Sequence, residues 1–288
     1  MTFGVVVSDP EDWTARAILA GFEKLERDAV FINLSELSAS IGDRLRFQVK
    51  GTDLSSLEGI VIRDMGRSGP HDLAFRFEAC CILESLGIPV VNPPPAIERA
   101  ANKFATTAAL HLAGVPEPRT TVTTDLESAM DAISEYKQAV SKPLCGYKGK
   151  GLALLGEWDR QKVAEILKKQ GVVYLQEFHR SDRDIRVFVI GEEVAGAIYR
   201  FAPSGEWISN LARGGRPEPC LVTDEIARLA IRANAAAGSV YSGVDLIETS
   251  EGLKVLEVNA TPSGKGIYLA WGVDVGLMIA RHVISGFG

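Results

Sequence analysis

Two acidic residues and an amide lie on a predicted β-hairpin at residues 243–259, where apolar residues alternate on both sides of a glycine-containing turn. If residues 250–252 form a three-residue loop, Asp245 lies directly opposite Glu257. Asn259 projects from the same face as Glu257, because it is two residues further along the strand. Facing carboxylates repel each other by about 0.2–1 kcal/mol, so a compensating cation is expected.

Carboxylate and amide oxygens in this arrangement are hard donors, which suit Mg²⁺ better than zinc. The sequence therefore predicts a magnesium site formed by Asp245, Glu257 and Asn259. The alternative interpretation is an ordinary hairpin with solvent-facing acids, because a slip of one residue would turn Asp245 to the other face.

A glycine-rich segment follows a predicted strand that ends at Lys142, and its glycines alternate with basic residues. The segment contains Gly146, Lys148, Gly149, Lys150 and Gly151. Its backbone N–H groups could bind phosphate. The segment matches neither G-x-x-x-x-G-K-[ST] nor G-x-G-x-x-G, which disfavours a P-loop or a Rossmann dinucleotide site. An ordinary flexible turn is the alternative.

Further charged residues occur at strand spacing. Asp184 and Arg186 share one face of a predicted strand, Arg200 ends the next strand, and Asn210 and Arg213 follow it. Together they predict a polar groove whose donors could hold phosphate or carboxylate oxygens. For each arginine taken alone, a surface ion pair is the alternative.

Composition limits the function classes. The 288 residues include 31 Lys and Arg against 37 Asp and Glu, a net charge of −6, which argues against general binding to nucleic acid or anionic membranes. The four cysteines show no C-x-x-C spacing, so no zinc signature is present. The first apolar stretch is too short for a signal peptide and no stretch reaches the ~20 apolar residues that span a bilayer, so we expect a cytoplasmic protein.

The elements that position these residues predict an α/β fold, α+β in its C-terminal half, in three units. Residues 1–92 begin with a strand at 3–7, a helix at 11–26 and a strand at 29–32, and continue with a strand at 59–62, a helix at 73–86 and a strand at 88–91. Three prolines at 93–95 start the second unit, 93–175, which contains the glycine-rich segment. The third unit, 176–288, contains a hairpin around Gly191-Glu192 and the acidic hairpin.

Several ordered motifs together resemble the ATP-grasp superfamily, specifically the RimK-like branch of carboxylate–amine ligases. They are Asn92-Pro93, Asn102-Lys103, 113–118, Lys142-Pro143 with its glycines, and 176–178, 184–186, 210–215, 243–248 and 256–262. The resemblance covers the chain from about Asn92 onward and implies an ATP-grasp fold with a Rossmann-like pre-ATP-grasp domain before it. Asn102 departs from the aspartate that relatives commonly carry, which puts one local charge in doubt.

For the nucleotide, the resemblance implies that Lys103 and Lys142 contact the ATP phosphates, and that Gly146, Gly149 and Gly151 cover them. It assigns the adenine end to a hinge at Gln176, Glu177 and Phe178, and the ribose to Asp184. Ser209 and Asn210 are also implied in nucleotide binding.

For the reaction, the resemblance implies that Arg186, Arg200 and Asn210 line the phosphoryl-transfer centre, with Mg²⁺ on Asp245, Glu257 and Asn259; Mn²⁺ could substitute. Arg213 and Gly214 would bind the substrate carboxylate.

The implied activity is ATP- and magnesium-dependent amide formation through an acyl phosphate, with glutamate as the amine and a cofactor tail or a protein C-terminus as the acceptor. Residues 142–144 and 260–264 resemble the archaeal-type ligases that glutamylate tetrahydromethanopterin more than the ligase that modifies a ribosomal protein. The alternatives are a carrier-protein ligase of lysine biosynthesis, an ATP-grasp kinase and a non-catalytic ATP-binding module. Relatives are commonly dimers or tetramers.

Overall fold

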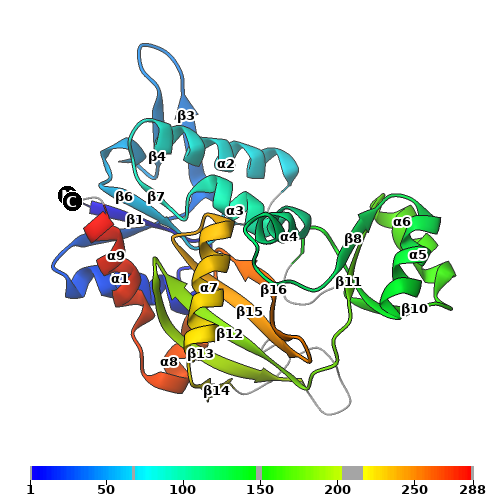
Figure 1. Ribbon diagram of the computed structural model, residues 1–288. Coiled ribbons are helices and arrows are strands. Elements are labelled where there is room, and N and C mark those ends of the chain that lie inside the picture. The colour runs from blue at the N-terminus through cyan, green and yellow to red at the C-terminus, as the bar shows by residue number, and fades with distance from the viewer. Residues whose placement is uncertain (1, 67–68, 147–150, 203–216, 287–288) are drawn as a thin grey trace.

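The computed structural model of the protein describes residues 2–66, 69–146, 151–202 and 217–286. These residues form three sheets of four or five strands, each with helices packed against it, and one small three-stranded sheet (Figure 1). The three larger sheets fall in the order expected from the sequence, and the α/β class is confirmed.

The first sheet is parallel, with strand order β2-β1-β6-β7. Its elements are β1 (Thr2–Val6), α1 (Trp13–Lys24), β2 (Asp28–Ile32), β6 (Gly59–Ile62), α2 (Pro70–Ser85) and β7 (Val90–Val91). Neighbouring residues of β1 face opposite sides, so Val5 packs with α1 whereas Val6 packs with α2. The predicted β-α-β beginning is confirmed, and the expected strand at 88–91 is shorter than predicted.

An antiparallel sheet between β2 and β6 was not predicted. It consists of β3 (Leu37–Ser40), β4 (Arg46–Val49) and β5 (Thr52–Asp53), with short 3₁₀ turns at Leu34–Glu36 and Leu54–Ser56. Phe47 and Val49 are buried in the core on the α2 side of the first sheet. The insertion thus covers that face of the N-terminal unit.

The second sheet is antiparallel, with order β10-β9-β11-β8, and projects to the side of the molecule in Figure 1. Its elements are β8 (Thr120–Thr123), α5 (Leu126–Tyr136), β9 (Gln138–Lys142), β10 (Ala153–Gly156), α6 (Arg160–Gln170) and β11 (Val173–Glu177). Ile133 and Val163 of the two helices are buried against Ala139 and Leu175 of the strands. The sheet therefore has one face covered by helices.

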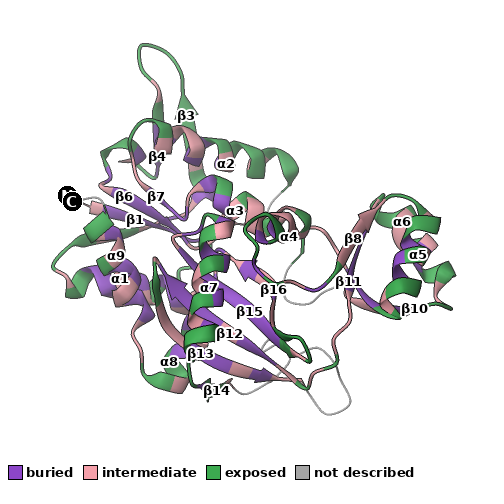
Figure 2. Cartoon of the chain, viewed as in Figure 1, coloured by how far each residue is buried: buried purple, intermediate pink, exposed green. Residues whose placement is uncertain are grey.

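The third sheet has order β14-β13-β12-β15-β16. Its strands are β12 (Arg183–Ile190), β13 (Glu193–Phe201), β14 (Pro217–Cys220), β15 (Tyr241–Thr249) and β16 (Gly252–Asn259), and α7 (Asp224–Ala237) follows β14. Ile185 and Val187 face the buried core under α7, the purple interior around that helix in Figure 2. Arg186, between them in sequence, therefore faces the other side.

Helices α3 (Pro94–Ala101) and α4 (Lys103–Leu112) pack against α7 and β16. Both helices come after the predicted boundary at 92/93, in the range expected for the second unit, but they lie on the third sheet. The second predicted boundary, at 175/176, falls within β11. The three domain ranges stay predictions.

Asn92 joins the N-terminal unit to the third sheet. It is fully buried, and its Oδ1 accepts hydrogen bonds from the N–H groups of Val240 (2.6 Å) and Tyr241 (3.0 Å). Its Nδ2 donates to the carbonyls of Tyr241 (2.8 Å) and Ala260 (2.5 Å). The buried amide thereby satisfies four backbone groups of the third sheet and the segment after it.

The last two helices are α8 (Lys265–Trp271) and α9 (Val275–Gly286), and α9 lies across α1. A Cβ atom added at Gly21 would lie 2.6 Å from the carbonyl oxygen of Gly276, and one at Gly276 would lie 2.1 Å from that of Ala17. Glycine at both positions lets the helix backbones touch. In the described residues no single helix is long and apolar enough to cross a membrane; α8 and α9 together have sufficient length and apolar composition, but the pair is bent by 117°.

The predicted hairpin around Gly191-Glu192 is confirmed, since Ile190 pairs with Glu193. The acidic hairpin has a shorter turn than predicted, because Thr249 pairs with Gly252 and only two residues form the loop. Its register then shifts between Asp245 and Leu246.

The shift places Asp245 opposite Glu257 and Leu246 opposite Val255, which makes Leu256 the extra residue of a β-bulge. The predicted three-residue loop is therefore wrong. The predicted facing of Asp245 and Glu257 is confirmed, because the bulge supplies the residue that the turn lacks.

Candidate active site

A cavity of about 1100 Å³ lies where the three units meet. Its lining includes Asp12, Arg63 and Asp64 from the N-terminal unit, Lys142 and Gln176 from the second sheet, and Arg186, Asp245 and Glu257 from the third. Pockets for one small ligand commonly occupy about 300–1000 Å³. The cavity lies just above the upper end of this range.

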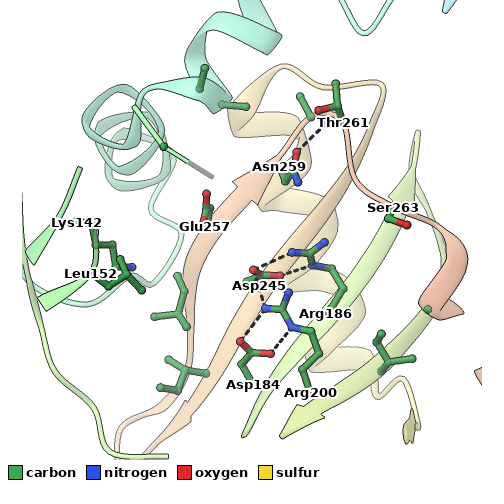
Figure 3. A pocket seen from close by; sticks show the side chains of 18 of the residues that line it. Lys142, Leu152, Asp184, Arg186, Arg200, Asp245, Glu257, Asn259, Thr261 and Ser263 are labelled. Atoms are coloured by element: carbon green, nitrogen blue, oxygen red, sulfur yellow. Dashed lines mark hydrogen bonds and ion pairs between the residues drawn. The ribbon is translucent and has the colours of Figure 1, made fainter. Parts of the chain in front are cut away.

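A row of charged side chains crosses the floor of this cavity (Figure 3). Arg186, Asp245 and Glu257 are cross-strand partners on β12, β15 and β16, so all three face the same side. Arg186 donates to both oxygens of Asp245, with Nη2 3.0 Å from Oδ2 and a shorter contact between Nε and Oδ1. Arg200 Nη2 lies 2.8 Å from the same Oδ2.

Arg200 also binds Asp184, with Nε–Oδ1 and Nη2–Oδ2 distances of 2.6 and 2.7 Å. Both side chains are buried, which rules out the surface ion pair considered for Arg200. The ribose contact implied for Asp184 stays a prediction, and in this structure Asp184 orients Arg200.

Two guanidinium groups thus supply positive charge that the sequence analysis assigned to a metal alone. Burial would raise the pKa of Asp245, but the charges of Arg186 and Arg200 outweigh it and lower the pKa to about 2. Asp245 is therefore a carboxylate at neutral pH.

The three predicted metal ligands fit Mg²⁺ unequally. Glu257 faces the cavity with a partly exposed carboxylate, and Asn259 Oδ1 accepts one hydrogen bond from the Thr261 N–H (2.9 Å), which leaves it a second lone pair. Asp245 is the least available of the three, because Arg186 and Arg200 together make three contacts with its two oxygens. The described residues contain no cluster of three or more His, Cys, Asp or Glu side chains suited to a metal, so the amide of Asn259 is needed to complete the set.

Two lysines accompany the charged row, Lys103 at the start of α4 and Lys142 at the end of β9. Asn102 caps α4 by accepting hydrogen bonds from the N–H groups of Phe104 (3.1 Å) and Ala105 (3.3 Å), so this amide does the capping expected of an aspartate. Lys103 Nζ then lies 3.4 Å from Glu257 Oε1. It also donates to the carbonyl of Gly146 (3.2 Å), which joins the glycine-rich segment to the acidic hairpin.

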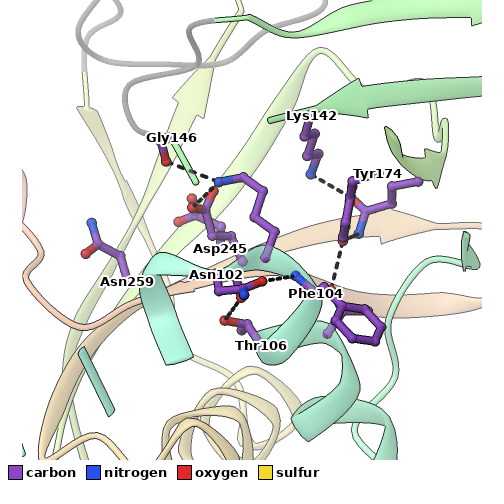
Figure 4. A network of polar contacts seen from close by, with 12 residues as sticks. Asn102, Phe104, Thr106, Lys142, Gly146, Tyr174, Asp245 and Asn259 are labelled. Carbon is purple, nitrogen blue, oxygen red and sulfur yellow. Dashed lines mark hydrogen bonds and ion pairs between the residues drawn. The ribbon is translucent and has the colours of Figure 1, made fainter. Parts of the chain in front are cut away.

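Lys142, at the end of β9, donates to Gln176 Oε1 (2.6 Å) (Figure 4). Gln176 Nε2 in turn donates to the hydroxyl of Tyr174 (3.2 Å), which bonds to Thr107 (2.8 Å). Burial lowers the pKa of Lys142 to about 8, with Lys103 adding to the decrease and Glu257 opposing it. A neutral glutamine as its bonded partner leaves the ammonium charge available to an anion.

This pKa predicts a pH-dependent proton uptake. The resemblance assigns the ATP phosphates to Lys142, and phosphates bound there would stabilise its ammonium and raise its pKa, so nucleotide binding above pH 8 would take up a proton. We expect the affinity for MgATP to fall as the pH rises above about 8, by at most about tenfold per pH unit. Calorimetry at pH 8.5 in two buffers of different ionisation enthalpy measures the proton uptake, and Lys142→Met should remove it. Equal apparent enthalpies in the two buffers for the unaltered protein would contradict the assignment.

Comparisons with known proteins agree with this geometry. Residues 100–283 match the RimK-like ATP-grasp domain. The tetrahydromethanopterin:α-L-glutamate ligase of Methanosarcina acetivorans is 38% identical over 97% of this chain and 98% of its own length. The chain belongs to the RimK-like ATP-grasp family. The ligase of the same name from Methanocaldococcus jannaschii is 35% identical over 99% of both chains.

The ATP-grasp fold extends beyond the matched domain. The ATP-grasp ligase PsnB, solved with a minimal precursor, superposes with a TM-score of 0.80 at 22% identity over 98% of both chains. A RimK-domain ATP-grasp protein of Sphaerobacter thermophilus superposes with a TM-score of 0.74 at 23% identity, over 99% of this chain. The predicted fold, with its N-terminal pre-ATP-grasp unit, is confirmed.

For a RimK-like ATP-grasp protein, the hinge after β11 is the expected adenine end. The N–H groups of Glu177 and Phe178 already donate to the carbonyls of Arg119 (2.8 Å) and Gln138 (3.0 Å). The Glu177 carboxylate binds Arg119 through both oxygens, at 3.0 and 2.8 Å. The adenine contact of this segment stays a prediction.

Several predicted site residues lie outside the described residues. They are Gly149, Ser209, Asn210, Arg213 and Gly214. Gly146 and Gly151 are described, and Gly146 lines the cavity. The phosphate, catalytic and substrate roles implied for the first group stay predictions.

The sequence analysis named no site residue in the N-terminal unit, yet Ser8, Asp12, Arg63 and Asp64 line the cavity. They follow β1 and β6, the two central strands of the parallel sheet. Ligands commonly bind beyond the carboxyl ends of parallel strands where the strand order reverses, and this rule could have identified them.

Proposed function

We propose that the protein is an ATP- and magnesium-dependent ligase that joins the amine of glutamate to an acceptor carboxylate, with release of ADP and phosphate. One observation supports this most: Lys142, Arg186 and Arg200 converge with carboxylate and amide oxygens in one large cavity, and Lys103 contacts Glu257, which also lines it. Such a site can hold a nucleoside triphosphate and a second anion together.

In the first step the acceptor carboxylate attacks the γ-phosphorus of ATP, and the bond between this phosphorus and the bridging oxygen breaks. ADP is the leaving group, and the acceptor becomes an acyl phosphate. Lys142 and Lys103 hold the phosphates, while Arg186 stabilises charge on the transferring group by exchanging part of its contact with Asp245. Bound Mg²⁺, held by Glu257 and Asn259 with Asp245 beside them, would neutralise phosphate charge.

In the second step the amine of glutamate attacks the acyl carbonyl, and phosphate leaves with the carbonyl–oxygen bond electrons. The amine loses its proton as the amide forms. The protein contributes orientation and the exclusion of water, which would otherwise hydrolyse the acyl phosphate.

We propose an acceptor of the tetrahydromethanopterin type. The support comes from relatives named for this activity, 35–38% identical over 94–99% of the chain. A cytoplasmic location, a homodimeric or homotetrameric assembly and the use of Mn²⁺ are further proposals that rest on the sequence.

The test is ADP and phosphate release with Mg²⁺, ATP and glutamate, using tetrahydromethanopterin, a glutamate-ending peptide or a carrier protein of lysine biosynthesis as acceptor. We expect a mass gain of one glutamyl residue on tetrahydromethanopterin. A mass gain on another acceptor would identify that acceptor as the substrate instead. A stable phosphorylated product formed without glutamate would replace the ligase by a kinase, and nucleotide binding without turnover on any acceptor would indicate a non-catalytic module.

A further inference from the structure

The segment that follows β16, residues 260–264, is hydrogen-bonded to the N-terminal unit at both of its ends. Asn92 Nδ2 donates to the carbonyl of Ala260, and the N–H of Gly264 donates to Thr14 Oγ1 (3.1 Å). Asn92 and Thr14 are fully buried. These contacts fix the two ends of the segment.

The middle of the segment is held by Arg63, which differs from Asn92 and Thr14 because it lines the cavity. Arg63 follows β6, and its Nη1 donates to the carbonyl of Thr261. Its Nε donates to Asp12 Oδ1 (3.0 Å). The Arg63 side chain is 12% exposed, so the guanidinium has little freedom to adopt other positions.

Thr261 is also the residue that orients Asn259. Its N–H donates to Asn259 Oδ1 at 2.9 Å (Figure 3). An amide can present either oxygen or nitrogen to a site, and only the oxygen binds a cation. The Thr261 N–H fixes the amide by binding Oδ1, which keeps a second lone pair for a cation.

We propose that Arg63 is a positioning residue for the magnesium ligand Asn259, acting through Thr261. The inference rests on the proposed function, in which Asn259 holds the metal. Residues that orient a ligand commonly contribute about 10–100-fold to metal affinity or activity. Asp12 completes the arrangement, because its carboxylate offsets the charge of Arg63 and also caps α1 by accepting the Ala15 N–H (2.8 Å).

The arrangement means that the pre-ATP-grasp unit contributes to the metal site without supplying a ligand. Without the Arg63 contact, the Thr261 carbonyl loses its side-chain donor, and the middle of the segment can shift between its two fixed ends, which weakens the contact with Asn259.

The experiment measures ADP binding by calorimetry as a function of Mg²⁺ concentration, in the full chain. Arg63→Met should raise the Mg²⁺ concentration needed for half-maximal binding about 10–100-fold, with ADP affinity in the absence of Mg²⁺ unchanged. Arg63→Lys retains the positive charge and a donor group. The Mg²⁺ concentration that it needs for half-maximal binding should lie between those of the unaltered protein and Arg63→Met. It also keeps the test decisive if Arg63→Met does not fold.

Arg99→Met is the matched control. Arg99 Nη1 also donates to a backbone carbonyl of another element, that of Ala237 (2.8 Å), at the end of α7. This variant should lose some stability but keep the Mg²⁺ dependence of the unaltered protein.

An unchanged Mg²⁺ dependence in Arg63→Lys and Arg63→Met would overturn the inference, as would an equal change in Arg99→Met. If ADP binding by the unaltered protein did not respond to Mg²⁺ at all, that result would count against the proposed function itself.

Discussion

Replacing Glu257 by alanine is expected to lower turnover about 10³-fold, because a metal that stabilises phosphate charge contributes several kcal/mol to the transition state. Glu257 faces the cavity from β16 with 37% of its side chain exposed. Its partner Lys103 lies 3.4 Å away, and a pair of this exposure contributes less than about 1 kcal/mol to stability. The free energy of unfolding should therefore change little.

The measurement is kcat for ADP release at saturating ATP, together with urea denaturation. Glu251→Ala is the matched control, because Glu251 lies in the turn of the same hairpin and its carboxylate forms an ion pair with the nearby Lys254 (2.7 Å). It should leave both quantities unchanged. Normal turnover in Glu257→Ala would remove Glu257 from the metal site.

Replacing Asp245 by alanine should lower both activity and stability, in contrast to Glu257→Ala. Asp245 is buried and binds Arg186 and Arg200, so its removal takes away the carboxylate that pairs with Arg186 and one of the two that pair with Arg200. Breaking a buried ion pair from one side commonly costs about 3–5 kcal/mol. We expect a decrease of that size in the free energy of unfolding, measured by urea denaturation.

The pH dependence identifies the cause of this loss. The pKa of Asp245 is lowered to about 2, below the model-peptide value of about 3.9 expected in the unfolded chain. Its stabilising effect is therefore complete above about pH 4 and is lost as the pH falls toward 2. The stability difference between the unaltered protein and Asp245→Ala should narrow over that range, and the difference for Glu257→Ala should stay small. A loss in Asp245→Ala that is independent of pH would indicate a packing defect instead.

The comparison of sequence and structure is clearest at the acidic hairpin. Alternation along the strands predicts which residues share a face, and it correctly joins Asp245, Glu257 and Asn259. The turn length was predicted wrongly, and the error cancelled because of the bulge at Leu256. A bulge depends on how the strand packs in the whole sheet, so the pattern of one hairpin does not reveal it.

The partners of the acids were also hidden in the sequence. Arg186 is 59 residues from Asp245 along the chain, and their pairing depends on β12 lying beside β15. Arg63 is 198 residues from Thr261, and only the packing of the N-terminal unit on the third sheet joins them. Motifs identified the residues that contact nucleotide in the family, whereas the residues that hold them in place come from tertiary contacts.

The crossing of α1 and α9 has a consequence for biosynthesis. Ile18 and Phe22 of α1 are fully buried in a core that also contains Val275, Ile279 and Val283. The first β-α-β unit therefore leaves the ribosome long before α9 has been synthesised, and the part of the α1 surface that α9 covers stays exposed in the nascent chain. Exposed surface of this kind binds chaperones or aggregates. The N-terminal unit thus completes its fold only after residues 275–286 have been synthesised, which makes late truncation a defect of the beginning of the protein as well as of its end.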